Sequence, residues 1–358
     1  MALQIGIVGL PNVGKSTLFK ALTRNDIDIA NYPFCTIEPN VGIVEVPDER
    51  LEKLSKLSNS EKTTPTVIEF VDIAGLVSGA HKGEGLGNKF LSHIREVDAV
   101  CQVVRVFADP DVTHVHNKID PQNDIEIINA ELIMADLETA QRRAESLKNT
   151  AKAGMKPELA KAIKTIEKII QALEQGKLAN TLEFDREEKT QIRDLNLLTI
   201  KPFIYAVNCD EEQIKDGSWE KGLAPGLEYI PFCAKLEAEL IELPEEEVQT
   251  YLKDFGWDKS GLERLIISGY KVLDLITFFT SGPKETRAWT VQRGAKAPEA
   301  AGRIHSDFEK GFIRAEICPW QKFIEAGGEP AAKAKGWIKT EGKDYVMRDG
   351  DVCYFLHN

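Results

Sequence analysis

Four short apolar runs of the chain each end at a glycine or at polar residues. They cover residues 3–8, 67–71, 99–107 and 203–207. Short runs that are apolar at nearly every position are typical of strands buried on both faces of a parallel sheet. A helical spacing of apolar residues follows the first run, at Leu18, Phe19 and Leu22. The pattern therefore predicts an α/β fold with a mainly parallel sheet.

Two longer stretches repeat their apolar positions with helical spacing. The intervals are 3-4-3-4-3 in the first and 4-3-4-3 in the second, and heptad stripes of this kind predict helices that pack as an antiparallel coiled coil. Gly154 and Pro157 lie between the stretches and favour a turn. We expect a helical coiled-coil insertion that projects as an arm. The stripes are Ala130, Ile133, Leu137, Ala140, Ala144 and Leu147, then Leu159, Ile163, Ile166, Ile170 and Leu173.

The C-terminal part of the chain alternates short strand-like runs with turn signals. The runs are 287–294, 311–317 and 343–356, and the last contains Arg-Asp-Gly-Asp as a turn between two strand-like halves. A helical pattern at 261–276 precedes them and should close the first domain or form a joint. We therefore predict a first domain of residues 1–122 and 198–280, the helical insertion 123–197, and a small α+β domain 281–358.

Composition narrows the class of protein. The 358 residues carry a net charge of −12, which argues against a protein coated in nucleic acid. No apolar run reaches the about 18 residues that a membrane span needs, and the start of the chain lacks the charged segment of a secretory signal. The six Cys include no Cys-x-x-Cys pair, which argues against zinc and disulfides and favours a reducing cytoplasm.

Two segments depart from the acidic balance. Residues 142–168 hold 8 Lys and Arg against 3 Asp and Glu, and residues 284–358 hold 13 against 11. Either segment could be an ordinary solvated face, or could contact RNA phosphates. The first forms the tip of the predicted arm, a position that suits contact with an RNA backbone, and both interpretations stay open.

The strongest chemical signal follows the first predicted strand. Residues 9–16 fit Gly-x-x-x-x-Gly-Lys-Ser between a strand and a helix, which is the context of a phosphate-binding P-loop. The two glycines let backbone N–H groups face phosphates, Lys15 reaches the β- and γ-phosphates, and the Ser16 hydroxyl binds Mg²⁺. The predicted nucleotide-binding residues of this loop are Gly9, Asn12, Val13, Gly14, Lys15, Ser16 and Thr17.

Two further segments favour a nucleotide-dependent switch. Asp72-x-x-Gly75 follows the second apolar run and should place Asp72 near Mg²⁺ and the Gly75 N–H near the γ-phosphate. Thr36, in the polar loop 31–40, is placed to cover Mg²⁺ when the γ-phosphate is present, or is a plain loop threonine. The predicted metal ligands are therefore Ser16, Thr36 and Asp72, with Lys15, Thr36 and Gly75 in catalytic roles.

Two tetrapeptides compete as the reader of the base. Residues 117–120, Asn-Lys-Ile-Asp, have the form of a guanine-reading motif but follow no strand. Residues 208–211, Asn-Cys-Asp-Glu, come directly after the apolar run 203–207, where a rigid base reader is expected. A short strand and Cys233-Ala-Lys then follow, similar to the loop that backs the base in GTP-binding switches. Order and spacing select Asn208, Cys209 and Glu211, with Cys233 and Ala234, as the base site.

Several motifs together resemble the YchF family, the Obg-like ATPases. They are "GLPNVGKST", "NYPFCTIEPN", "DIAGLVSGAHKGEGLGNKFL" and "GRIHSDFEKGFIRAEI", and the resemblance covers essentially the whole chain. It implies a P-loop domain with a helical insertion, a C-terminal TGS domain of β-grasp form, Mg²⁺-dependent ATP hydrolysis and association with ribosomes.

The base motif departs from the guanine-reading pattern, with Cys209 for Lys and Glu211 for Asp. A carboxylate accepts from the two guanine donors but is repelled by the adenine N1 acceptor. We therefore expect Glu211 to turn aside, the Cys209 N–H to lie near the base, and ATP to bind more tightly than GTP, by about tenfold.

No Gln occupies the position that orients the attacking water in Ras-like switches, because residue 76 is Leu. Asn12 could help hold a K⁺ ion beside the phosphates, or it only shapes the loop. His114 could swing toward the γ-phosphate, or it is a surface residue. Three functions stay open: an ATP-hydrolysing switch, a GTPase, and a ribosome adaptor whose turnover is incidental.

Overall fold

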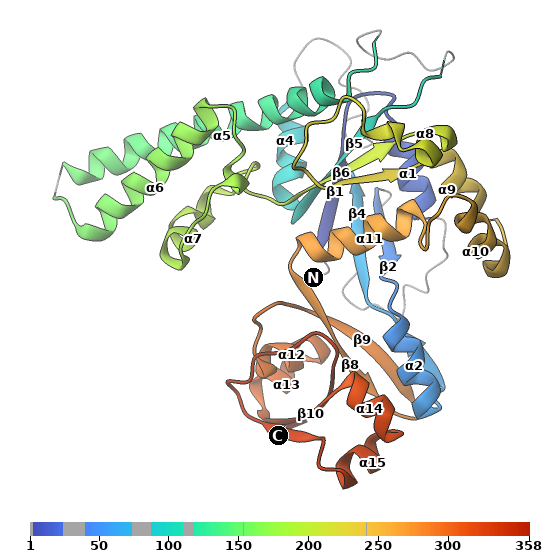
Figure 1. Cartoon of the computed structure of the whole chain (residues 1–358). Helices are drawn as coiled ribbons and strands as arrows, with labels where there is room; N and C mark the ends of the chain where they lie inside the picture. The colour runs from blue at the N-terminus through green and yellow to red at the C-terminus, as the bar shows by residue number, and fades with distance from the viewer. Residues whose placement is uncertain (1–2, 24–39, 74–86, 110–117, 153, 241) are drawn as a thin grey trace.

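The computed structural model describes residues 3–23, 40–73, 87–109, 118–152, 154–240 and 242–358. In these residues the chain builds two sheets and a helical arm that projects away from both (Figure 1). The mainly parallel sheet and the helical insertion confirm the predicted fold class. No helix in the described ranges is both long enough and apolar enough to cross a membrane.

The first sheet has the strand order β2-β4-β1-β5-β6-β7. Its strands pair in parallel except β2, which runs antiparallel to β4. Continuous apolar runs form these strands because helices cover both faces, as the buried cluster around Ile5, Phe70 and Phe232 shows. The strands are β1 (Gln4–Val8), β2 (Val41–Glu45), β4 (Val67–Asp72), β5 (Ala99–Arg105), β6 (Phe203–Asn208) and β7 (Tyr229–Phe232).

The helices of this part follow the strands in chain order. They are α1 (Lys15–Leu22), α4 (Gly87–Glu96), α8 (Glu211–Asp216), α9 (Ala234–Leu240), α10 (Glu245–Asp254) and α11 (Gly261–Val272). Ser260 caps α11, which contacts β6 and β7 of the first sheet and β8 of the second. It therefore closes the first sheet and also forms the joint, as the sequence predicted.

The arm is a pair of antiparallel helices, α5 (Pro121–Ala151) and α6 (Pro157–Glu174), with α7 (Arg186–Ile192) packed beside α6 (Figure 1). Pro stands in the first turn of α5 and of α6, where its missing N–H costs nothing. The predicted stripes pack against each other through Ala140, Ala144 and Ile166. Ala130 is an exception, because it lies exposed.

A second sheet occupies the C-terminal part, in the order β11-β10-β12-β8-β9-β3. Successive residues of its strands alternate between two buried clusters on opposite faces. One face carries α12 (Ala297–Ile304) and α13 (Ser306–Lys310), and the other α2 (Glu49–Ser58), α14 (Trp320–Ala326) and α15 (Glu329–Ala334). The strands are β3 (Lys62–Thr64), β8 (Leu275–Ser281), β9 (Glu285–Gln292), β10 (Phe312–Pro319), β11 (Lys339–Glu341) and β12 (Asp351–His357).

Residues 46–66 leave the first sheet and dock on the second. Helix α2 packs on β8 and β9, and β3 pairs in parallel with β9. The Arg50 guanidinium donates to Asp48 at 2.7 Å and to Asp349 at 2.6 Å, and thereby ties this segment to the turn before β12. The domain boundaries inferred from the sequence remain a proposal, and these pairings put β3 and β8 with the C-terminal strands.

One strand-like run of the tail does not form a strand. Residues 343–347 contribute only a bridge between Val346 and Lys296. The prediction of two strand-like runs around Gly350 is therefore wrong for the run before the turn. The backbone of this run is used elsewhere: Tyr345 O accepts from Ala297 N at 2.9 Å, and Met347 N donates to Ala295 O at 2.9 Å. The run thus fixes the start of α12 instead of extending the sheet.

Candidate functional site

The phosphate loop has the backbone that its glycines predict. Gly9 and Gly14 have φ of 148° and 101°, in the region that favours glycine. A Cβ at Gly14 would lie 2.2 Å from Asn208 Nδ2, and a Cβ at Gly9 would lie 2.5 Å from the Val103 carbonyl oxygen. Larger residues are therefore excluded at both positions by conformation and by contact.

Lys15 is a buried cation at the first turn of α1. Its side chain is folded onto its own loop, with Nζ donating to the Leu10 carbonyl at 2.6 Å. Burial lowers the pKa of Lys15 to about 8, although the nearby Asp72 carboxylate raises it. A cation that has lost this much hydration is ready to be stabilised by a bound anion.

The other predicted residues of the loop lie around Lys15. Ser16 and Thr17 are exposed and line the adjoining cavity, as does Asn12, which adopts a left-handed backbone with φ of 62°. Val13 is fully buried. Asp72 ends β4 with 6% of its surface exposed, on the Lys15 side of the sheet edge.

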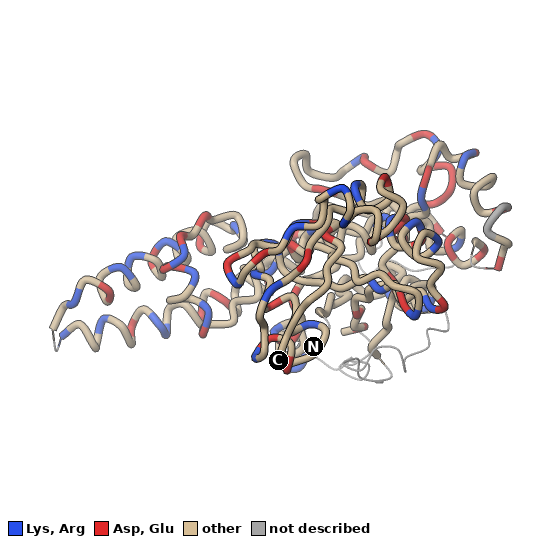
Figure 2. Tube along the Cα trace, turned by 90° about the horizontal axis from the view of Figure 1, so that it is seen from below, with Lys and Arg blue, Asp and Glu red and all other residues tan. Residues whose placement is uncertain are grey.

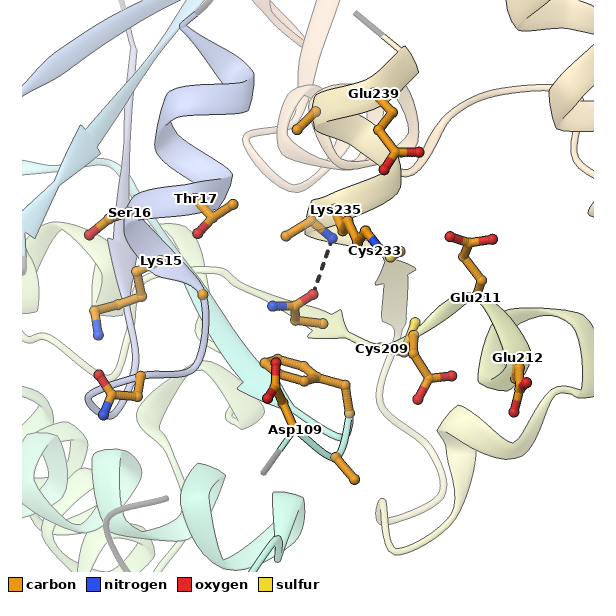
Figure 3. Close-up of a pocket in the computed structure, with 18 of the residues that line it drawn as sticks. Lys15, Ser16, Thr17, Asp109, Cys209, Glu211, Glu212, Cys233, Lys235 and Glu239 are labelled. Carbon is orange, nitrogen blue, oxygen red and sulfur yellow. Dashed lines mark hydrogen bonds between the residues drawn. The ribbon is translucent and has the colours of Figure 1, made fainter. Parts of the chain in front are cut away.

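Asn208 joins the phosphate loop to the second base segment. Its Nδ2 donates to the Val13 carbonyl at 3.0 Å, and its Oδ1 accepts from the Ala234 N–H at 3.2 Å (dashed line, Figure 3). The side chain is 3% exposed. Its oxygen therefore already has a donor, and the amide holds two loops in register across the edge of the sheet.

The structure corrects one expectation for Cys209. Its backbone N–H donates to the Phe232 carbonyl at 2.9 Å, and its Sγ lies 3.2 Å from the same oxygen. The N–H is therefore held by β7 and is not offered to a base. Burial raises the pKa of the Cys209 thiol to about 12, so it behaves as a small apolar group in the cluster around Val207 and Leu236.

The two acids of the Asn-Cys-Asp-Glu segment have different tasks. Asp210 caps α8 by accepting from Gln213 N at 2.9 Å, within a reciprocal capping box. Glu211 is the first residue of that helix and lines the cavity. Figure 3 shows its carboxylate on the side of the cavity formed by Cys233 and Glu239, away from Lys15. Helix α8 thus begins at Glu211 because the preceding acid is used as the cap.

Cys233 and Ala234 begin α9 on the opposite wall. Burial raises the pKa of the Cys233 thiol, whereas N–H groups of Leu236 and Lys235 that point at the sulfur lower it. The Ala234 N–H is the donor to Asn208. Behind this wall, burial raises the pKa of Glu237 to about 7. The Gly261 N–H donates to Glu237 Oε1 at 2.6 Å and acts in the opposite direction, lowering this pKa.

All these segments meet around a cavity of about 1070 Å³ at the carboxyl ends of the parallel strands (Figure 3). This is the edge at which open α/β sheets bind ligands, and the volume is sufficient for a nucleotide. The lining residues that the sequence predicted are Asn12, Gly14, Lys15, Ser16, Thr17, Asn208, Cys209, Glu211, Cys233 and Ala234. Those that it missed include Phe107, Ala108, Asp109, Lys235, Glu239 and Glu242.

A buried arginine supports part of the missed wall. Arg105, 2% exposed at the end of β5, donates to the Phe107 carbonyl at 3.1 Å and to the Asp109 carbonyl at 3.4 Å. Its guanidinium lies 4.3 Å from the centre of the Phe107 ring. A charged residue near the end of a mainly apolar run is the sequence signal that points to this support.

The tetrapeptide 117–120 has a structural role where it is described. Asp120 is partly exposed, caps α5 by accepting from Asn123 N at 3.4 Å, and pairs with Lys118 at 3.2 Å. It does not line the cavity. Thr36, Gly75, Leu76 and His114 lie outside the described residues.

Family models match an N-terminal and a C-terminal part of the chain. Residues 4–138 match the MMR_HSR1 family, described as a 50S ribosome-binding GTPase. Residues 275–358 match YchF-GTPase_C, described as a protein of unknown function (DUF933).

Two full-length relatives carry the same name. The chain is 51% identical to the ribosome-binding ATPase YchF of Bacillus subtilis and 48% identical to that of Escherichia coli O157:H7, in each case over 100% of both chains. The solved structure of the Schizosaccharomyces pombe YchF GTPase is 40% identical, with a TM-score of 0.88 over 99% of this chain and 97% of that one. Sequence, fold and site geometry agree, and the chain belongs to the YchF family.

Proposed function

We propose that this chain is a Mg²⁺-dependent molecular switch that binds and hydrolyses ATP and associates with ribosomes. The observation that carries the proposal is the cavity that joins the phosphate loop to the segments after β6 and β7. A buried lysine stands at one end, and the Asn-Cys-Asp-Glu segment stands at the other. This arrangement matches a nucleotide with phosphates toward Lys15 and base toward Glu211 (Figure 3).

The residues of the phosphate end fit a nucleotide with its metal. The left-handed glycines leave room for a close anion, and the desolvated Lys15 supplies its charge. Ser16, Asp72 and Thr36 would hold Mg²⁺, which when bound neutralises charge on the β- and γ-phosphates. Lys15 would stabilise the γ-phosphate as negative charge shifts during transfer to water.

Two residues are candidates for completing the catalytic set, because Leu76 cannot orient water. Asn12 lies on the cavity wall, and a K⁺ ion held beside it would stabilise the transition state as an arginine finger does. His114, which lies outside the described residues, is the second candidate. Comparing turnover in K⁺ and Na⁺ for the wild type and Asn12→Ala tests the first. A K⁺ activation that survives Asn12→Ala would remove Asn12 from that role.

The base end supports a preference for ATP. Guanine offers two donors to a carboxylate, whereas adenine N1 is an acceptor that a carboxylate repels. Glu211 faces the Cys233 and Glu239 side, and Asp210 is used in capping (Figure 3). Because the Cys209 N–H and the Asn208 oxygen already have partners, we infer that other backbone groups read the adenine edge.

Nucleotide titration of the purified protein tests the assignment. We expect ATP to bind about tenfold more tightly than GTP, equivalent to about 1.4 kcal/mol. The alternative is a GTPase. The family matched by residues 4–138 and the Schizosaccharomyces pombe protein are both described as GTPases, which favours this alternative. Equal affinities, or tighter binding of GTP, would establish that alternative.

The ribosome partner rests on the relatives and on charge. The Bacillus subtilis and Escherichia coli relatives are named ribosome-binding. Figure 2 shows Lys and Arg along the projecting arm up to its end. Near that end Lys148 pairs with Glu167 at 3.0 Å, while Lys152 bonds the neighbouring Asn149 at 3.0 Å. The C-terminal domain is the second proposed contact.

Co-sedimentation with ribosomes at several salt concentrations tests this surface. Replacing three lysines at the tip with Glu should weaken association and leave ATP hydrolysis without ribosomes unchanged. Binding by the wild type should fall steeply with salt, as expected for phosphate contacts. A matched triple replacement outside the arm should not weaken ribosome association. Equal loss of ribosome association in both variants would refute a specific contact at the arm tip. The tip set is Lys148, Lys152 and Lys156, and the control set is Lys221, Lys253 and Lys271.

The same assay separates a switch from an adaptor. A switch changes its ribosome affinity with bound nucleotide, so Lys15→Ala should abolish turnover and also remove the difference between ATP and ADP states. Ribosome binding that is identical with ATP, with ADP and in Lys15→Ala would instead establish an adaptor.

A further inference from the structure

The second sheet opens along the seam between β8 and β12. Strand β12 pairs with β10 along its whole length, from His357 to Asp351. It pairs with β8 only at Val352, opposite Phe279. Beyond that point β8 continues with β9 alone. Among the described strands, none pairs with the β8 side of residues 353–357, so one edge of β12 faces an opening inside the sheet.

A cavity of about 370 Å³ lies at this opening. Since side chains alternate along β12, Cys353 and Phe355 belong to the α12–α13 face and Tyr354 to the other. Trp289 and Phe308 line the cavity on the first face. Tyr354 is 65% exposed.

The lining of the cavity is acidic. Glu285, Glu316 and Glu329 contribute carboxylates, and no Lys or Arg is among the residues that line it. Two of these acids have partners. Glu285 accepts from Thr64 Oγ1 at 2.6 Å and lies 3.9 Å from Arg287, and Glu316 lies 3.8 Å from the exposed Lys333. The cavity therefore combines aromatic surface with net negative charge, which suits a cationic group on an apolar stem.

A cation already stacks on one of these rings. The guanidinium of Arg287 lies 4.4 Å from the centre of the Trp289 ring. The same surface should repel nucleic acid, because its carboxylates oppose phosphates. It thus differs in charge from the basic arm tip and fits a different class of partner.

We propose that an extended basic segment of a partner protein binds in this opening. The segment adds as a strand to the β12 edge at residues 353–357. Its apolar side chains contact Trp289, Phe308 and Phe355, and a Lys or Arg side chain reaches Glu316 and Glu329 across the seam. Backbone hydrogen bonds give such additions their affinity, and alternate side chains give them their specificity. An accessible strand edge without a partner is otherwise a site of unwanted pairing.

A short peptide tests the site on the full chain. The probe is a fluorescein-labelled, N-acetylated hexapeptide of alternating Lys and Val, with an alternating Glu and Val peptide as its charge control. Binding is measured by fluorescence anisotropy, and amide hydrogen exchange is measured residue by residue. We expect the basic peptide to bind and to slow exchange in residues 353–357 by about tenfold, equivalent to about 1.4 kcal/mol.

Variants assign the contacts. Glu316→Lys and Glu329→Lys should each weaken the peptide about tenfold, and Tyr354→Ala should weaken it too. Glu325→Lys is the matched control, since it makes the same charge change on an exposed residue of α14 that does not line the cavity. ATP binding should be measured for every variant to show that the fold is intact.

Three outcomes would overturn the proposal. The first is equal affinity for the Lys-Val and Glu-Val peptides, or for Glu329→Lys and the wild type. The second is peptide binding without slower exchange in residues 353–357, because the peptide would then lie elsewhere. The third is protection of these amides by a single-stranded RNA, or by raising the protein concentration without peptide. It would assign the edge to RNA or to a second copy of this chain.

Discussion

The buried Lys15 predicts that nucleotide binding takes up a proton. Burial lowers its pKa to about 8 in the nucleotide-free chain. Phosphate oxygens would favour the charged form, so binding should raise the pKa above the assay range. A group with a pKa of about 8 is about half protonated at pH 8 and about nine-tenths protonated at pH 7. Binding should therefore take up about 0.5 proton at pH 8 and only about 0.1 at pH 7.

Calorimetry measures this uptake directly. A non-hydrolysable ATP analogue with Mg²⁺ is titrated into the protein between pH 7.5 and 9, in pairs of buffers that differ in ionisation enthalpy. The difference in observed heat gives the protons exchanged. Lys15→Arg is the control, because an arginine stays charged throughout this range and should take up none at this position.

Two results would refute this reasoning. Uptake that stays constant from pH 7.5 to 9 would show that no group with a pKa near 8 is coupled to binding. Equal uptake by Lys15→Arg would show that another group is responsible. If Lys15→Arg fails to bind, the midpoint of uptake in the wild type remains decisive, because only a midpoint near pH 8 agrees with the burial of Lys15.

Three further changes test other parts of the site. Gly14→Ala should lower nucleotide affinity at least about tenfold, because its Cβ would lie 2.2 Å from the side-chain amide of Asn208. Gly217→Ala is the control, because Gly217 also has a left-handed backbone but has open space around it. It should leave nucleotide affinity unchanged and tests the effect of backbone strain alone. Glu211→Asp should shift the nucleotide preference toward GTP. Asp120→Ala should weaken only the N-terminal cap of α5. A loss of nucleotide affinity in Asp120→Ala would instead assign the base-reading role to residues 117–120. Burial raises the pKa of Glu237 from 4.5 to about 7. Between these two pH values the folded chain binds more protons than the unfolded chain, so the free energy of unfolding should fall as the pH rises. The expected decrease is about 3 kcal/mol between pH 4.5 and 7, with no further change above pH 7. Denaturant unfolding of Glu237→Gln, which cannot titrate, should lack this component, and identical pH profiles for the two proteins would contradict it.

Much of the fold follows from the sequence where burial is two-sided. The apolar runs at 3–8, 67–71 and 203–207 became β1, β4 and β6 because a strand covered on both faces needs apolar side chains at every position. The arm followed from its heptad stripes. The docking of α2 on the second sheet did not, because an amphipathic helix shows which of its own faces is apolar but not which sheet covers it.

The site was predictable where chemistry fixes residue types at a fixed spacing. The phosphate loop and the Asn-Cys-Asp-Glu segment line one cavity, as motif and order indicated. The hydrogen bond from the Cys209 N–H to Phe232 was not predictable, because it depends on how far β6 and β7 pair. Asp109 was missed for a related reason: its place on the cavity wall depends on the path of the chain after β5, and on Arg105, which holds that path.

The segment between β2 and β4 connects the nucleotide site to the second sheet. Thr36 lies shortly before β2, Asp72 ends β4, and the Asp72 N–H donates to the Asn40 carbonyl at 2.9 Å, so both predicted switch regions adjoin this strand pair. At its far end the same segment is fixed to the second sheet through Arg50 and β3. A displacement near Asp72 would therefore be carried about 20 Å along an ordered strand instead of being absorbed by a loop.

This connection ends at the proposed peptide opening. Ser60 donates to the Gly282 carbonyl at 2.8 Å, and Thr64 donates to Glu285, and both acceptors line the acidic cavity. A peptide in this cavity would lie beside Glu285, which accepts from Thr64, and would thereby act on the segment that leads to Asp72. Coupling between binding sites is reciprocal, so any change that ATP makes in peptide affinity must equal the change that the peptide makes in ATP affinity.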